Sequence, residues 1–303
     1  MIYGLNLKAI DHVDLLVEKG VEVERLGFHI LWTYDLPILR YTPLVASAIA
    51  SKTEEIRIGL GFTPLLHSLD RITNILYTLT EMHGERFEIC LIPGDKNRLH
   101  QVGIPWRRFK GVVQRVREEG ERLRDRLEEW GLKCRIWLGA QGPRMLGIAS
   151  SFNGVQLNLC NLEMVKWGLE KLGGVRDNFS IGIIASSYIY RDFDEEMYDH
   201  LRRSSIRVAR AASKEVVKAA GVGDALKAVE ESGEDYEKID GRTLDLLVEK
   251  FTITMPTYRL GEYLSKIEGL EIESFTFSTP QDLSLEAIRD LASALPLKPR
   301  SNR

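Results

Sequence analysis

The chain has 303 residues, of which 44% are hydrophobic and 28% are charged, and its formal net charge is -3. This balance is ordinary for a globular protein and excludes a disordered or collagen-like chain. Because the charge is slightly negative and gives no basic field, we expect no nucleic-acid partner.

Composition also predicts where the protein works. No run of about 20 apolar residues is present, and the N-terminus has no signal-peptide pattern, so we expect no membrane association. The cysteines Cys90, Cys134 and Cys160 form no CxxC pair. The six histidines lack the spacing of a metal site, so we expect none. The sequence therefore predicts a cytoplasmic protein with reduced cysteines and no metal.

From the first residue onward, short apolar strands alternate with amphipathic helices, which is typical of βαβ units and a parallel sheet. Eight strands are expected, at residues 2–7, 28–34, 56–62, 86–92, 134–139, 153–158, 179–190 and 272–278. Eight strands with intervening helices favour a closed (β/α)8 TIM barrel over an open sheet. We expect one domain over residues 1–303, because chains of this length commonly form a single barrel.

Two predicted helices illustrate the pattern. In residues 107–130, apolar residues recur at helical spacing while Arg and Glu alternate on the opposite face, so one side packs on the barrel. The helix at residues 66–82 has an apolar stripe wider than one barrel wall needs. We therefore expect a homodimer or higher homo-oligomer that uses this helix.

Between the seventh and eighth strands, the regular spacing breaks. Residues 194–250 have a charged helical pattern with glycine punctuation and no convincing strand. The sequence predicts a helical insertion there, too polar to be a separate domain.

Three segments directly follow predicted strands, where a barrel places its catalytic loops. Asp35 ends the second strand and is either a turn residue or an active-site acid. The segment 93–96 (Pro-Gly-Asp-Lys) makes a sharp turn, after which Asp95 and Lys96 can reach the barrel mouth or form a local surface pair.

The third segment is 139–145, Gly-Ala-Gln-Gly-Pro-Arg-Met, after the fifth strand. Its small residues let a ligand approach the backbone, and the proline suits the first turn of a helix. Free amides at such a helix start accept a phosphate. An ordinary strand-to-helix turn is the alternative. By contrast, Gly59 and Gly61 only begin a dinucleotide fingerprint, because Pro64 replaces its third glycine.

Together these segments resemble the luciferase-like superfamily of flavin and deazaflavin enzymes, and within it the methylenetetrahydromethanopterin reductase group. The resemblance covers nearly the whole chain, through segments 24–28, 32–35, 53–59 and 84–87. The segments 93–96 and 139–143 carry the more specific match.

The resemblance implies an oxidoreductase that holds coenzyme F-420 at the barrel mouth and transfers a hydride to or from a small or pterin-like substrate. The catalytic candidates are then Asp95 and Asp35, and the substrate-binding candidates are Asn6 and Lys96. The implied cofactor contacts come from Gly61, Phe62, Thr63, Gly94, Ala140, Gln141, Gly142 and Asn158, with the phosphate near Gln141 and Gly142. The resemblance also implies a bulge with a cis peptide bond between Gly61 and Phe62.

The chain departs from the family at three places. Asn6 stands where the family has an acidic residue, Leu36 stands where a histidine follows the second strand, and residues 62–66 replace a Thr-Asn-Pro stretch. Two alternatives therefore stay open. One is an FMN-dependent monooxygenase of the luciferase type, and the other is a flavin-binding protein without turnover.

Overall fold

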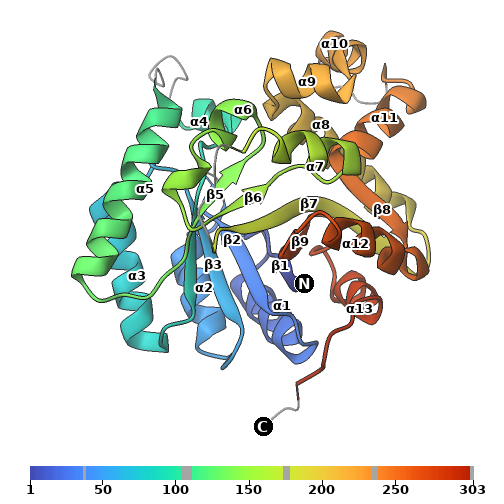
Figure 1. Cartoon of the computed structure of the whole chain (residues 1–303). Coiled ribbons are helices and arrows are strands. Elements are labelled where there is room, and N and C mark those ends of the chain that lie inside the picture. The colour runs from blue at the N-terminus through green and yellow to red at the C-terminus, as the bar shows by residue number, and fades with distance from the viewer. Residues whose placement is uncertain (37–38, 104–110, 173–177, 234–237, 301–303) are drawn as a thin grey trace.

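The computed structural model describes residues 1–36, 39–103, 111–172, 178–233 and 238–300, with residues 96–98 described by their backbone alone. Eight parallel strands close into a barrel surrounded by helices (Figure 1), as the sequence predicted. The closing contact joins β6 to β7. The (β/α)8 fold is thus confirmed.

The strand boundaries differ from the predicted ones by at most two residues. The strands are β1 (Ile2–Asn6), β2 (Ile30–Tyr34), β3 (Arg57–Phe62), β4 (Phe87–Leu91), β5 (Ile136–Ala140), β6 (Gly154–Leu157), β7 (Ser180–Tyr190), β8 (Thr252–Pro256) and β9 (Ser274–Ser278). Around the barrel their order is β1 to β7 and then β9, which returns to β1.

The strand β8 is not part of the closed barrel and was not predicted. The long β7 pairs with β6 through residues 180–183, and with β8 only through residues 186–190, beyond the end of β6. The sheet therefore has nine strands, and β8 extends it at the carboxyl end of β7.

The helices alternate with the strands as expected. They are α1 (Val13–Arg25), α2 (Thr42–Ala50), α3 (Leu69–His83), α4 (Lys96–Gln101), α5 (Val112–Glu129), α6 (Pro143–Leu146), α7 (Leu162–Leu169), α8 (Glu195–Ala211), α9 (Lys214–Ala220), α10 (Gly223–Glu231), α11 (Gly241–Phe251), α12 (Leu260–Glu268) and α13 (Leu285–Ser293). The helices α8 to α11 form the predicted insertion and gather on one side of the barrel in Figure 1.

The core lies between the strands and the helices. Alternate strand residues such as Leu31, Leu60 and Leu138 are fully buried against the helix layer. The insertion contributes Ile206 and Leu247 to the same cluster of buried residues. Burial of apolar surface on this scale is the main term that stabilises such a fold.

The predicted cis peptide bond between Gly61 and Phe62 is wrong. Among the described residues, the cis bond is the one between Thr279 and Pro280. The strand β3 stays regular to its end, since Gly61 is in register with Tyr34 and Phe62 with Leu91.

Within the described residues, no helix is both long and apolar enough to span a membrane.

Candidate functional site

Two aromatic rings from β2 fill the barrel interior below its carboxyl end. A Cβ atom on Gly59 would lie 2.1 Å from the Trp32 ring, and one on Gly61 would lie 2.0 Å from the Tyr34 ring. Only glycine at these two positions of β3 leaves room for the rings. Gly61 therefore serves the packing of Tyr34.

The Tyr34 hydroxyl crosses the barrel and donates a hydrogen bond to the side-chain carbonyl of Gln156 on β6. Burial raises the pKa of Tyr34 well above its usual value, so the phenol stays protonated. Tyr34 and Gln156 therefore form an aromatic, polar and uncharged floor below the carboxyl end of the barrel.

Beside this floor, Asn6 ends β1. Its side-chain amide nitrogen donates to the Ser278 hydroxyl on β9 at 2.8 Å. Its Oδ1 atom is buried and has no hydrogen-bond partner within the described chain. A buried acceptor without a partner is costly and rare in folded proteins. Asn6 thus offers a fixed acceptor to an N–H or O–H group of a bound molecule.

The turn after β5 provides a second unpartnered amide. The Gln141 Nε2 atom is buried without a partner within the described residues. Ala140 is buried at the end of β5, and its carbonyl accepts from the Asn158 backbone N–H at 2.9 Å. Asn158 therefore lies directly beside this turn.

Gly142 caps the start of α6 and faces the insertion. A Cβ atom on Gly142 would lie 3.1 Å from the Ser213 hydroxyl, which itself caps the start of α9. The structure thus brings the predicted phosphate turn and the insertion together, a contact that the sequence did not reveal. Bulk at Gly142 would push against Ser213.

The turns after β3 and β4 also meet. Thr63 is fully buried, and its hydroxyl donates to the Pro93 carbonyl at 3.4 Å. Gly94 has a φ of 88°, a conformation that favours glycine, and a Cβ atom there would lie 3.2 Å from the Thr63 hydroxyl. Asp95 follows at the start of α4, where its carbonyl accepts from the Leu99 N–H at 2.9 Å. The side chain of Lys96 lies outside the described part.

Asp35 has a partner that sequence reasoning missed. The His67 ring nitrogen Nε2 lies 2.5 Å from Asp35 Oδ2, and both side chains are buried. The other oxygen of Asp35 lies 3.5 Å from the Thr42 N–H at the start of α2. The His67 ring packs edge-on against Phe62, at 5.1 Å between centroids, on the helix side of β3.

This pair separates Asp35 from the interior residues. His67 is 32 positions from Asp35 in the chain, so no local motif links them. Its Nδ1 atom is buried without a partner among the described residues. His67 brings an imidazole to Asp35 from the loop that follows the neighbouring strand β3.

No group of three His, Cys, Asp or Glu side chains suited to a metal ion is found in the part of the chain that the structure describes. The polar groups described at the carboxyl end include amides, hydroxyls, the His67 imidazole and the carboxylates of Asp35, Asp95 and Asp282. Such a set recognises an organic molecule by hydrogen bonds.

A family model described as luciferase-like monooxygenase matches residues 5–253. The chain belongs to this family. A curated relative, the 5,10-methylenetetrahydromethanopterin reductase of Archaeoglobus fulgidus, is 28% identical over 197 residues, which are 57% of this chain and 59% of the relative. The chain therefore aligns with somewhat more than half of that relative's length.

Two solved structures share the fold. The coenzyme F-420-dependent tetrahydromethanopterin reductase of Methanopyrus kandleri has a TM-score of 0.77 and 19% identity, and the match covers 97% of both chains. An F-420-dependent secondary alcohol dehydrogenase, in complex with an F-420–acetone adduct, has a TM-score of 0.72 and 12% identity, over 97% of this chain and 98% of that one. By their names all three relatives are oxidoreductases, the class that the sequence predicted.

Proposed function

We propose that this chain is a coenzyme F-420-dependent oxidoreductase that transfers a hydride between the reduced cofactor and a small or pterin-like substrate. The observation that carries the proposal is the pair of buried, unpartnered amide atoms at the carboxyl end of the barrel, Asn6 Oδ1 and Gln141 Nε2. Ligand sites of α/β barrels lie at this end. The likeness to F-420-dependent enzymes supports the choice of cofactor.

The residues present fit a ring with a phosphate-bearing tail. The uncharged floor made by Tyr34 and Gln156 suits a flat, polar ring. Asn6 Oδ1 would accept a ring or substrate N–H, and Gln141 Nε2 would donate to the tail. The Gly142 turn would bind the phosphate through backbone N–H groups, with Asn158 adding a polar contact.

When bound, the deazaflavin supplies the hydride chemistry, and the protein supplies orientation and proton control. The turns that carry Thr63, Gly94 and Asp95 would form one wall, and Gly61 and Phe62 the wall beside it. Asp95 would hold or move a proton at its carboxylate, and Lys96 would contact the substrate. Asp35 would act from its pair with His67, as a positioning group for the loop after β3.

Two alternatives have observations in their favour. The name of the matching family favours an FMN-dependent monooxygenase. The trans bond at Gly61, the neutral Asn6 and the departure at Leu36 favour a protein that binds a flavin without turnover. We propose a cytoplasmic location because the described cysteines are free, as expected in a reducing compartment.

Titration of the purified chain with coenzyme F-420 and, separately, with FMN tests the proposal. We expect the absorbance or fluorescence of F-420 to change at lower concentration than that of FMN, and we expect turnover of the reduced deazaflavin with a pterin or a small carbonyl substrate. Oxygen consumption with reduced FMN would establish the monooxygenase instead. Tight binding without any turnover would establish the silent protein.

A further inference from the structure

A pocket of about 280 Å³ opens at the amino-terminal end of the barrel, where β3, β4 and β5 begin. This is the end opposite to the candidate cofactor site. Positive side chains outnumber negative ones among the residues that line the pocket. The cations are Arg57, Arg86, Lys133 and Arg135, and the acids are Glu85 and Glu88.

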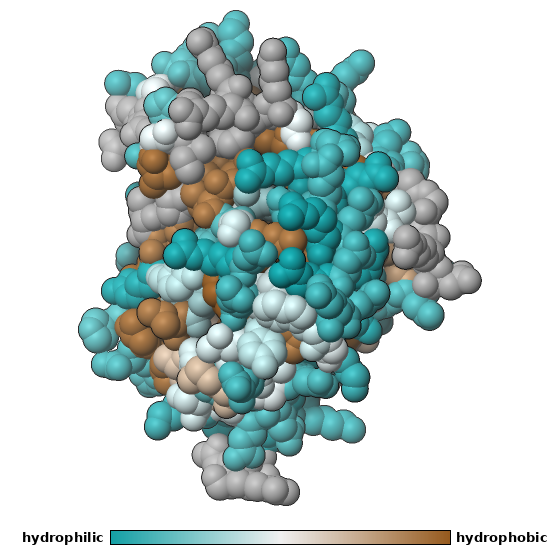
Figure 2. Space-filling model, turned by 90° about the vertical axis from the view of Figure 1, so that its left-hand side faces the viewer, coloured by the Kyte–Doolittle hydropathy of each residue, from teal (hydrophilic) through white to brown (hydrophobic). Residues whose placement is uncertain are grey.

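Charge by itself does not mark a binding site, because a charged helix face in water is common. The side of the molecule that carries α3 and α5 has a broad hydrophilic area in Figure 2. On α5, four of the five arginines lie within 4.0 Å of a carboxylate. The cations of the pocket must therefore be compared with the acids beside them.

Both acids of the pocket are matched by cations. Glu88 is buried, and its Oε1 atom accepts from Arg57 Nη1 at 2.5 Å. Its Oε2 atom accepts from the indole N–H of Trp137 at 2.6 Å. Glu85 lies 3.9 Å from the Lys133 ammonium, and both side chains are at least half exposed. No acid of the pocket is left to balance Arg86 and Arg135.

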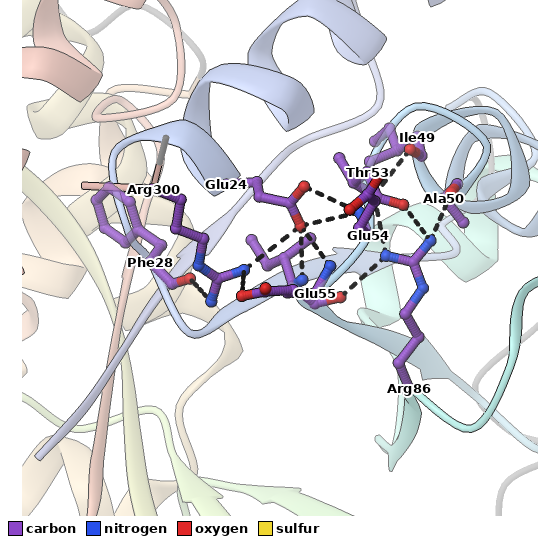
Figure 3. A network of polar contacts seen from close by, with 10 residues as sticks. Glu24, Phe28, Ile49, Ala50, Thr53, Glu54, Glu55, Arg86 and Arg300 are labelled. Carbon is purple, nitrogen blue, oxygen red and sulfur yellow. Dashed lines mark hydrogen bonds and ion pairs between the residues drawn. The ribbon is translucent and has the colours of Figure 1, made fainter. Parts of the chain in front are cut away.

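Arg86 and Arg135 form no ion pair within the part of the chain that the structure describes. The Arg135 guanidinium donates only to the Ser180 hydroxyl, at 3.4 Å. The Nη atoms of Arg86 bind the loop before β3 (Figure 3), but its Nε atom is buried and has no described partner. Burial lowers the pKa of Arg86, against the effect of Glu24 and Glu54. A further negative charge beside these two guanidinium groups would therefore be favourable.

We propose that this pocket binds a small anion of the phosphate type, at a site separate from that of the cofactor. A planar guanidinium offers two parallel N–H groups that match two phosphate oxygens, and the pocket has two such groups without a carboxylate. A hollow of about 280 Å³ has room for inorganic phosphate, diphosphate or a small phosphate ester. An anion that binds only the folded chain also stabilises it.

Isothermal titration of the full chain with sodium diphosphate at fixed ionic strength tests the proposal. We expect a dissociation constant of about 0.1 mM or below, and a melting temperature that rises with diphosphate. Arg135→Ala should weaken binding at least about 10-fold. Arg135→Lys, which keeps the charge but loses the planar fork, should lie between this variant and the wild type.

The matched control is Arg117→Ala. Arg117 is a 48% exposed arginine on α5 that is paired with Glu121, so this variant should bind diphosphate as the wild type does. Circular dichroism would establish that the variants are folded. Titration with inorganic phosphate and with glycerol phosphate distinguishes the sources of the anion. Tighter binding of the ester supports an organic phosphate, and tighter binding of the inorganic ions supports phosphate or diphosphate itself.

A further variant separates this pocket from the turn after β5. Gly142→Val should bind diphosphate as tightly as the wild type, because Gly142 lies at the opposite end of the barrel. A loss of binding in Gly142→Val would assign the anion to that turn and overturn the proposal. So would an Arg135→Ala variant with unchanged affinity, or a wild type that binds no diphosphate up to about 10 mM.

Discussion

At the amino-terminal end of the barrel, one carboxylate organises a whole loop. Glu24 accepts hydrogen bonds from the backbone N–H groups of Glu54, Glu55 and Ile56 at 2.7–2.9 Å. As Figure 3 shows, Arg300 joins it from the C-terminal tail, and Arg86 binds the same loop from the other side. Burial alone would raise the pKa of Glu24, but these N–H groups and Arg300 lower it.

The carboxyl end of the same barrel differs. Of the ten buried side-chain polar atoms without a partner in the described chain, five lie at or after the carboxyl ends of strands, on Asn6, Thr42, His67, Gln141 and Asp282, and Thr33 lies one residue before the end of β2. At the amino-terminal face, Arg86 Nε is one such atom. The groups that stabilise the fold and the groups that can bind a ligand therefore lie mainly at opposite ends of the barrel. A polar group whose hydrogen bonds are all made inside the protein stabilises the fold but is not available to a ligand.

The largest effect is expected at the amino-terminal end. Glu24→Ala leaves three backbone N–H groups without their acceptor and should lower the free energy of unfolding by about 3 kcal/mol. Chemical denaturation measures this. Cofactor affinity should stay the same. Glu18→Ala, an exposed acid on the same helix α1, is the control and should change stability by less than about 0.5 kcal/mol. A Glu24→Ala variant as stable as the Glu18→Ala control would contradict the stabilising role of the amino-terminal end.

At the carboxyl end, Asp95→Asn should lower turnover by about 100-fold while cofactor affinity and stability change little, because the two side chains are nearly isosteric. Steady-state kinetics and a binding titration separate the two effects. Asp35→Asn is the informative contrast, since it also weakens the buried pair with His67 and should lower the melting temperature. Full activity of the Asp95 variant would make Asp95 a turn residue.

Gly142→Val tests the turn after β5. Added bulk meets Ser213 and blocks the backbone of the turn, so cofactor affinity should fall at least about 10-fold. Gly223→Val is the control, because a Cβ atom there meets nothing within 4 Å. Isothermal titration with coenzyme F-420 measures both variants. Equal affinities would move the phosphate site elsewhere.

The contributions of the two ends to the stability of the fold should also change in opposite directions as the pH falls. Near the end of α1, hydrogen bonds from Arg25 lower the pKa of Glu22 from 4.5 to about 2, together with Arg289 and against the effect of burial. This stabilisation is present above pH 4.5 and is lost as the pH falls towards 2. Beyond β9, burial raises the pKa of Asp282, so its protonation favours the folded state.

The melting temperature should therefore fall between about pH 4.5 and pH 2, and Glu22→Gln should flatten that fall. Asp282→Asn should instead make it steeper. Thermal unfolding followed by circular dichroism at a series of pH values measures all three proteins. An unchanged pH profile in the Glu22 variant would contradict this assignment.

The eight barrel strands could be predicted because each one is an apolar run that is followed by an amphipathic helix. The strand β8 could not, because its five residues form a strand only against the extra length of β7. The cis bond at Gly61 was inferred from family resemblance, whereas the glycine here makes room for the Tyr34 ring. His67 could not be predicted because the aspartate that it contacts follows a different strand, and a spacing of 32 residues carries no local signal.

The smallest effect gives the most direct test of the comparison, because it makes the same chemical change at the two ends. Thr53 and Thr33 are both buried, at 5% and 0% exposure. At the amino-terminal end, the Thr53 hydroxyl donates to the Ile49 carbonyl at 2.9 Å and accepts from Arg86 at 3.1 Å. Near the carboxyl end of β2, the Thr33 hydroxyl has no partner among the described residues. Thr53→Val should therefore cost about 1.5 kcal/mol, since it removes the two hydrogen bonds of a buried hydroxyl, the one to the Ile49 carbonyl and the one from the Arg86 guanidinium. Thr33→Val should stabilise the fold by up to about 1 kcal/mol, because it removes a buried hydroxyl that makes no hydrogen bond and places a β-branched apolar side chain in a strand.

Urea denaturation of the two variants beside the wild type measures the difference. A loss at Thr33 equal to the loss at Thr53 would mean that the carboxyl end is as fully paired as the amino-terminal end.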